Sequence, residues 1–262
     1  MVVLFLCHGE APGALSESRR IQDAIAGLAD FWLLFHSNGG NAPPDIAGAD
    51  LYQFTDESIA TLPYTRFTKT IVPGSAHFPL LQFFRDHSGY HRYWLIEYDV
   101  RFSGDWRDLF DSFADHDADF LSCHLRDYAD EPKWRWWEPM SHPRRRIPLA
   151  KRLRSFNPIY RISGPALLYL DRMHRDGWSG HFEALIPTLL FEGGFRLGDF
   201  GGSGRFVLPE HRNRFYIEGP QNEAGHLHEG TMRWRPEFPD MSPAFSGWER
   251  NKLFHPVKST VG

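Results

Sequence analysis

Two acidic residues, separated by one position, follow an apolar run in this 262-residue chain. Glu97 and Asp99 come directly after the hydrophobic segment 93–96, which has the composition of a buried strand. Side chains two positions apart on an extended chain point to the same side, so the two carboxylates can share one cation. A divalent cation there would neutralise a diphosphate and assist its departure. Acid-x-acid pairs are also common in solvated turns. The prediction of a cation site therefore depends on the apolar strand that precedes Glu97 and Asp99.

Two histidines late in the chain could complete such a site. His226 and His228 are separated by one residue, and on an extended segment their side chains face the same way. Oxygen and imidazole ligands together suit Mn²⁺, whereas Mg²⁺ would depend more on the carboxylates and on water. The alternative is a pair of surface histidines, because the chain has 14 histidines and such spacing arises easily by chance.

Polar residues also follow the first apolar run of the chain. The hydrophobic segment 1–7 is followed by His8, Gly9 and Glu10, and a glycine directly after a buried strand lets the backbone approach a ligand closely. Ligands of open parallel sheets bind at the carboxyl ends of the strands. We therefore expect these three residues, and Asp56 after a later strand, to contact a bound substrate.

A third acidic residue could act as a base. Glu183 follows a glycine-containing turn and is a candidate to take the proton from an acceptor hydroxyl, while Trp178 offers a ring on which a sugar can stack. The alternative is an acid at a helix N-terminus that interacts favourably with the helix dipole. The basic and aromatic stretch 133–146 could cover an anionic donor, a sugar acceptor or a phosphorylated carrier, or it could be a solvated loop.

The elements that must position these residues alternate between strands and helices. Apolar runs predict strands, and helical spacing of apolar residues predicts helices. Strands are predicted at 1–7, 31–35, 50–54, 93–96, 120–123 and 157–163, and helices at 16–28, 77–87, 105–113, 165–174 and 181–191. This alternation predicts an α/β fold with a Rossmann-type, mostly parallel central sheet flanked by helices. After residue 193 little regular structure is expected.

The composition argues against several other classes of protein. The hydrophobic fraction of 42% and the charged fraction of 24% are those of a folded domain, and the net charge of −4 does not favour nucleic acid as a partner. Cys7 and Cys123 form no CxxC pair, which fits a reducing, cytoplasmic setting. Neither a basic leader nor a run of about 20 apolar residues is present, so we expect no transmembrane segment.

Three segments of the chain resemble the GT-A glycosyltransferases. The run 93–106 is similar to their DxD region, in which a buried strand ends in an acid-x-acid motif that binds the metal and the sugar nucleotide. The segment 177–188, with Glu183, is similar to the one that places an acidic residue beside the acceptor. The segment 226–234 resembles the late histidine that completes the metal site. The first acid of the motif is Glu97 instead of Asp, so Asp99 is the expected direct ligand.

The resemblance implies one GT-A-like domain that transfers a sugar from a nucleoside-diphosphate-sugar donor to a hydroxyl of a glycan or other acceptor. Residues 1–125 would form the nucleotide-binding half, with the nucleoside near His8, and residues 126–262 the acceptor half and a C-terminal tail. The cation would be Mn²⁺ or Mg²⁺, although some members of this fold work without metal. The alternatives are a metal-dependent phosphoesterase or nucleotidyltransferase that uses the same acids, and a catalytically inactive GT-A-like domain that binds glycans.

Overall fold

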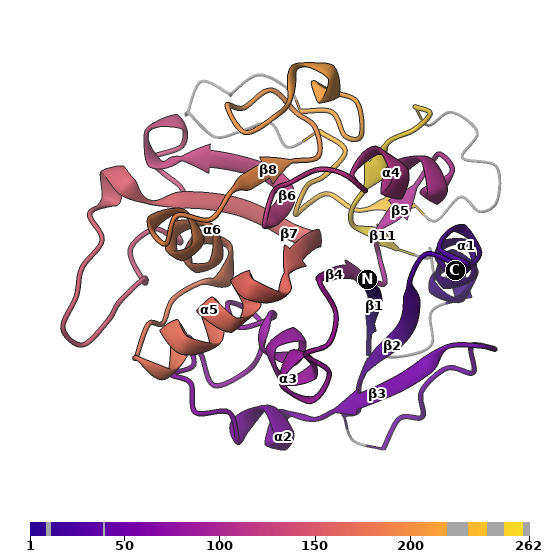
Figure 1. Ribbon diagram of the computed structural model, residues 1–262, viewed down its shortest axis with the longest axis horizontal. Helices are drawn as coiled ribbons and strands as arrows, with labels where there is room; N and C mark the ends of the chain where they lie inside the picture. Colours follow the sequence, from indigo (N-terminus) through magenta and orange to yellow (C-terminus); the bar gives the residue numbers. More distant parts are fainter. Residues whose placement is uncertain (9–11, 39, 219–229, 240–248, 259–262) are drawn as a thin grey trace.

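The computed structural model describes residues 1–8, 12–38, 40–218, 230–239 and 249–258. Its centre is a seven-stranded sheet with the strand order β3-β2-β1-β4-β7-β6-β8 (Figure 1). Four of the predicted site residues, Gly9, Glu10, His226 and His228, lie outside the described residues.

The first half of the chain forms four strands that lie side by side and run in one direction. They are β1 (Val2–Cys7), β2 (Asp30–His36), β3 (Asp50–Phe54) and β4 (Arg92–Glu97), with helices α1 (Pro12–Ala24), α2 (Asp56–Ala60) and α3 (Phe78–Asp86) between them. The apolar runs of β1 and β4 are continuous because both faces of the sheet are covered. In β1, for example, Leu4 and Phe5 belong to the cores on opposite faces.

The second half adds three strands to the same sheet. Strand β7 is antiparallel to both of its neighbours, β4 and β6, whereas β6 and β8 pair in parallel. The elements are β5 (Arg101–Phe102), α4 (Trp106–Ser112), β6 (Phe120–Asp127), β7 (Leu153–Ser163), α5 (Gly164–Arg175), α6 (Phe182–Glu192) and β8 (Leu197–Asp199). The predicted α/β fold with a mostly parallel sheet is therefore confirmed.

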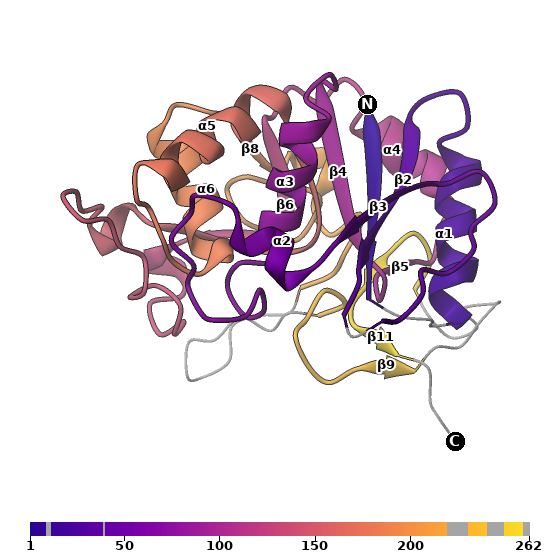
Figure 2. The same cartoon turned by 90° about the horizontal axis from the view of Figure 1, so that it is seen from below.

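Helices cover both faces of the sheet. Helices α1 and α4 pack on one face, and α2, α3, α5 and α6 pack on the other (Figure 2). The chain then continues through three very short strands, β9 (Phe238–Pro239), β10 (Leu253–Phe254) and β11 (Val257–Lys258). Strand β10 pairs with β5, and β11 pairs with β9. These contacts bring the C-terminal segment back to the first half of the chain.

Several element boundaries differ from the predicted ones. Strand β7 begins at Leu153, four residues before the predicted start at 157. The prediction began too late because buried arginines interrupt the apolar pattern of the strand. The guanidinium of Arg154 pairs with Glu131, and that of Arg161 donates to backbone carbonyls, including that of Phe113. Helix α1 spans Pro12–Ala24 rather than 16–28, and Leu28, the last residue of the predicted helix, is 40% exposed.

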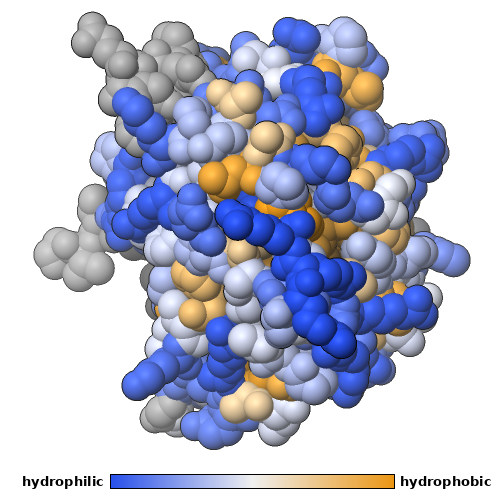
Figure 3. Space-filling view, turned by 90° about the vertical axis from the view of Figure 1, so that its left-hand side faces the viewer, coloured by the Kyte–Doolittle hydropathy of each residue, from blue (hydrophilic) through white to orange (hydrophobic). Residues whose placement is uncertain are grey.

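The outer surface is mainly hydrophilic on the face drawn in Figure 3. The large apolar side chains that are exposed belong to separate elements and loops: Leu28, Leu51, Val72, Leu168, Phe191, Leu208 and Trp234. Among the described residues, every helix is too short or too polar to cross a lipid bilayer.

Two buried histidines join α3 to α5. The Nε2 atoms of His77 and His174 lie 2.7 Å apart, and both residues are only 2% exposed. Burial lowers the pKa of His174 to about 4 and lowers that of His77 well below its usual value. Both imidazoles are therefore neutral at neutral pH, and one ring donates its N–H to the other.

Acid should consequently destabilise the fold through this pair. An unfolded histidine has a pKa of about 6.5, so the unfolded chain takes up a proton at a higher pH than folded His174 does. The stability that depends on the neutral ring is thus fully present above pH 6.5 and is lost as the pH falls toward 4. Between pH 7 and pH 5 the free energy of unfolding should fall by about 2 kcal/mol for His174 alone.

Urea unfolding at pH 7, 6 and 5 measures this loss. The variant His174→Gln should show a loss smaller by about 2 kcal/mol than the wild type, whereas His91→Gln, at an exposed histidine, should keep the wild-type pH dependence. Equal losses in the wild type and in His174→Gln would contradict the prediction.

Candidate functional site

Polar residues gather where four parallel strands end. His36 is the last residue of β2, Asp56 follows β3, and the Nε2 atom of His36 lies 3.2 Å from Oδ1 of Asp56. His8 follows β1, and its ring makes an edge contact with the ring of Tyr98 at a centroid distance of 4.8 Å. Since Glu97 ends the adjacent strand β4, these residues form one polar edge of the sheet, as the strand-end rule predicts.

Three potential metal ligands converge at the end of β4. One ligand atom each from Glu97, Asp99 and His255 lies within 4.8 Å of the others. The Nε2 atom of His255 is 3.5 Å from Oδ1 of Asp99 and 3.7 Å from Oε2 of Glu97. The backbone N–H of Val257 donates to the carbonyl of Asp99 over 2.8 Å. The C-terminal segment therefore closes directly onto the two acids.

The ring of His255 is oriented by a backbone contact. Its Nδ1 lies 2.9 Å from the carbonyl oxygen of Arg233, so Nδ1–H donates there and Nε2 faces the carboxylates. A hydrogen bond of this kind selects the tautomer in many metal-binding histidines. Oδ1 of Asp99 is buried and faces Nε2 of His255. The two carboxylates and the imidazole together fit a divalent cation such as Mn²⁺.

A lysine lies on the other side of Asp99. The Nζ atom of Lys258 is 2.5 Å from Oδ2 of Asp99 and 2.5 Å from the hydroxyl of Tyr98. Burial alone would raise the pKa of Asp99, but hydrogen bonds and charge from His255 and Lys258 hold that pKa well below its usual value. Asp99 is therefore ionised, and the Lys258 ammonium lies directly against its carboxylate.

The same two acids act on the histidine. Burial would lower the pKa of His255, but hydrogen bonds and charge from Asp99 and Glu97 raise it to about 10. Near neutral pH the imidazole therefore holds a proton between the carboxylates, and a cation that binds there must displace it.

Glu183 lies in the first turn of α6, beside β7. Its Oε1 accepts a hydrogen bond from the backbone N–H of Asn157 at 3.4 Å, and its Oε2 is 3.7 Å from Nδ1 of His181. Burial, followed by two nearby arginines, lowers the pKa of His181 to about 3, so its ring is neutral. Phe156, which precedes Asn157 on β7, has its ring centroid 5.2 Å from that of His255. Two consecutive residues of β7 thus contact Glu183 and His255, Asn157 the first and Phe156 the second.

Trp178, the residue predicted to stack on a sugar, is largely buried. Trp178 is 4% exposed, and its ring packs against that of His142 at a centroid distance of 4.9 Å. In this arrangement little of the indole face is available to a ligand. Two other tryptophans, from the loop 133–146, contact His181 or Arg154. Trp136 stacks on the ring of His181 at 4.6 Å, and Trp134 lies under the guanidinium of Arg154.

The sequence prediction missed His255 and Lys258. It assigned the late metal ligand to His226 and His228, which lie outside the described residues. No local signal could have found them, because the strands β10 and β11 that flank His255 are two residues long and give no periodic pattern.

Comparisons with known proteins give a fold-level likeness. No protein-family model and no curated protein matches the chain. Among solved structures, an active-site mutant of LgtC, elsewhere named a galactosyltransferase, is 12% identical over 82% of this chain and 82% of its own, with a TM-score of 0.47. HddC from Yersinia pseudotuberculosis is 12% identical over 76% of this chain and 89% of its own, with a TM-score of 0.41.

A third match is a glycosyltransferase involved in glycosylation of the major capsid of PBCV-1. It is 9% identical over 76% of this chain and 82% of its own, with a TM-score of 0.36. At these TM-scores and identities the likeness assigns neither an activity nor a role for any residue.

Proposed function

We propose that this chain is a glycosyltransferase that moves a sugar from a nucleoside-diphosphate-sugar donor to a hydroxyl acceptor with the help of a divalent cation. The observation that carries the proposal is the convergence of Glu97, Asp99 and His255 at the end of β4, with Lys258 beside them. Such a site offers ligands for a cation and a fixed ammonium group for a diphosphate.

The donor would lie along the polar edge of the sheet. Asp99 and His255 would hold the cation directly, and Glu97, whose side chain is 27% exposed, would hold it directly or through water. A cation there supplies Lewis-acid stabilisation of the departing diphosphate. Lys258 would add a second positive charge, and the nucleoside would extend past His8 toward His36 and Asp56.

The acceptor would approach from the side of α6. In an inverting transfer the acceptor oxygen forms a bond to the anomeric carbon while the bond to the diphosphate breaks. The proton of the acceptor hydroxyl passes to the Glu183 carboxylate. Because His181 is neutral, the contact at 3.7 Å places no histidinium charge against that carboxylate.

A thermal-shift panel tests the proposed function. Nucleoside mono-, di- and triphosphates are added with Mn²⁺, with Mg²⁺ or with a chelator. One nucleoside diphosphate with Mn²⁺ should stabilise the protein most, by about 2.7 kcal/mol at a concentration a hundredfold above its Kd. The responding nucleotide then selects the donor sugars for a transfer assay.

The panel also separates the alternatives. A preference for a triphosphate, with release of pyrophosphate in the presence of a sugar phosphate, would indicate a nucleotidyltransferase. Hydrolysis of simple phosphate esters would indicate a phosphoesterase. If no nucleotide stabilises the protein with either cation, the proposal is wrong and a glycan-binding domain becomes the better reading.

A further inference from the structure

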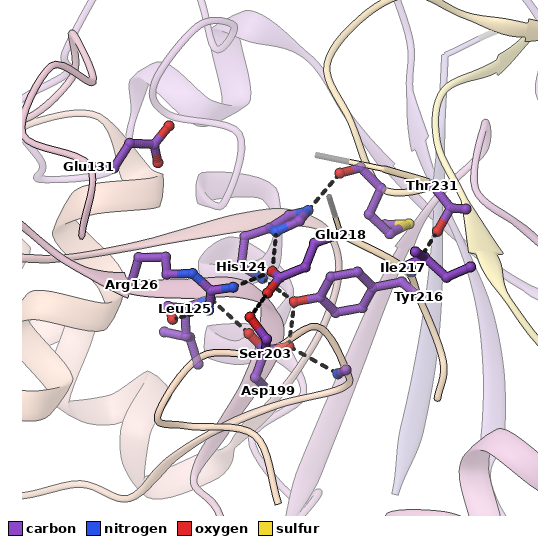
Figure 4. Close-up of polar contacts among 12 residues, drawn as sticks. His124, Leu125, Arg126, Glu131, Asp199, Ser203, Tyr216, Ile217, Glu218 and Thr231 are labelled. Carbon is purple, nitrogen blue, oxygen red and sulfur yellow. Dashed lines mark hydrogen bonds and ion pairs between the residues drawn. The ribbon is translucent and has the colours of Figure 1, made fainter. Parts of the chain in front are cut away.

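A buried polar network lies at the end of β6 and contains charged groups that the proposed reaction does not use. Glu218 accepts hydrogen bonds from Arg126 and Ser203, and Asp199 accepts from the Tyr216 hydroxyl at 2.8 Å (Figure 4). The Arg126 and Glu218 side chains are only 5% and 4% exposed. An ionic network of this depth, with its members hydrogen-bonded to one another, favours a single arrangement of the segments that it joins.

His124 is the member of this network that faces the C-terminal segment. It is fully buried on β6, and its Nε2 lies 2.7 Å from the carbonyl oxygen of Met232. Its Nδ1 lies 3.6 Å from Oε2 of Glu218, and its backbone N–H donates to the hydroxyl of Tyr216. The ring therefore joins β6 to the segment that contains Met232; Figure 4 shows His124 beside Glu218.

That segment is the one that holds His255. The N–H of His255 donates to the carbonyl of Thr231, and the N–H of Arg233 donates to the carbonyl of His255. The Arg233 carbonyl also accepts from Nδ1 of His255. Met232, whose carbonyl contacts the His124 ring, lies between Thr231 and Arg233 in the sequence and forms a β-bridge with His255. A shift of Met232 would thus move both backbone contacts of His255.

The backbone at His124 is held in an unfavourable region. Its φ is +51°, in the left-handed region that residues with a Cβ rarely adopt. A non-glycine residue stays there only when its surroundings determine it strongly. His124 holds this conformation while its imidazole contacts the Met232 carbonyl and Glu218.

We propose that His124 is a positioning residue for His255: its contact with Met232 fixes the segment that aims the imidazole of His255 at Glu97 and Asp99. This inference rests on the proposed function, because it assigns His124 a role in cation binding. Among the described residues, the ligand atoms that converge there are those of Glu97, Asp99 and His255, so His124 is not a member of this set.

The variant His124→Asn gives a sharp test. Asparagine tolerates a positive φ better than most residues, so the backbone can keep its conformation, but the shorter side chain cannot reach Met232. Titration of the metal-free protein with Mn²⁺ should show binding weakened by about 10-fold to 100-fold, as for other residues that support a metal ligand. Binding of the nucleoside diphosphate in the presence of a chelator should stay at the wild-type level.

A double-variant experiment identifies the route of the effect. If His124 acts through His255, adding His124→Asn to His255→Gln should weaken Mn²⁺ binding no further. The control His211→Asn removes another buried imidazole, 5% exposed and packed against Phe113, and should leave Mn²⁺ affinity unchanged. A further loss in the double variant would overturn the proposal.

Hydrogen exchange tests the same idea without metal. In His124→Asn, peptides that cover 230–236 and 252–258 should exchange faster, while those of β1 and β4 should be unaffected. Should His124→Asn fail to fold, Glu218→Gln is the second variant and should loosen the same two peptides. Wild-type exchange in both peptides would overturn the positioning role. If the wild type binds no Mn²⁺ while His124→Asn still exchanges faster in these peptides, the proposed function is overturned instead.

Discussion

Replacing Asp99 by Asn should abolish the metal-dependent part of nucleotide binding and raise the Kd for the nucleoside diphosphate with Mn²⁺ by more than about 100-fold. The amide keeps the shape of the side chain but has no negative charge for a cation. It also removes the charge that faces both His255 and Lys258 in the wild type. Titration calorimetry with and without Mn²⁺ measures the change.

The control for Asp99→Asn is Asp111→Asn, at an exposed acid of α4 whose carboxylate pairs with Arg107 of the same helix. It should bind the nucleotide like the wild type. Since Asp99 is buried, Glu97→Gln serves as a second variant at a more exposed ligand. If both Asp99→Asn and Glu97→Gln are folded and give wild-type heats with Mn²⁺, the carboxylates do not hold the cation.

Replacing Glu183 by Gln should lower kcat for sugar transfer by about a hundredfold to ten-thousandfold while donor binding stays intact. Glutamine can still accept the hydrogen bond that Glu183 accepts from the N–H of Asn157, but it cannot take a proton from an acceptor. Initial rates at saturating donor and acceptor, together with the Kd for the donor, separate the chemical step from binding.

The matched control is Glu192→Gln at the other end of α6, where the carboxylate lies 3.8 Å from Lys151 on the surface. Its kcat should equal that of the wild type. The anomeric configuration of the product must be determined alongside, because a retaining enzyme need not use a protein base on the acceptor. Inversion together with an unchanged kcat in Glu183→Gln would show that Glu183 only supports the start of α6.

The parts of the fold that were predictable are those in which one signal dominates. Strands β1, β2 and β4 are uninterrupted apolar runs, and such runs arise when a strand is covered on both faces. From parallel strands it follows that the residues after them meet at one edge, and His8, His36 and Glu97 do lie there. The acid-x-acid pair could therefore be located from local sequence alone.

The remainder depends on contacts between distant parts of the chain. The direction of β7 could not be predicted, because it depends on which strands β7 pairs with in the folded molecule, and one of them, β4, is distant in the sequence. The same holds for His255: two-residue strands give no periodic signal, and nothing local distinguishes this histidine from the other histidines of the chain.

The most distant contact in the candidate site also has a kinetic consequence. His255 and Lys258 reach Asp99 on a segment whose strand pairing with β5 and with β9 extends over only two residues in each case, beside single backbone hydrogen bonds such as that from Val257 to Asp99. Segments paired over so few residues open more often than the long strands of the central sheet. A diphosphate held between the acids and this segment would leave when the segment opens. The rate of opening, rather than the strength of any single contact, would then set the residence time of the product and the upper limit on turnover.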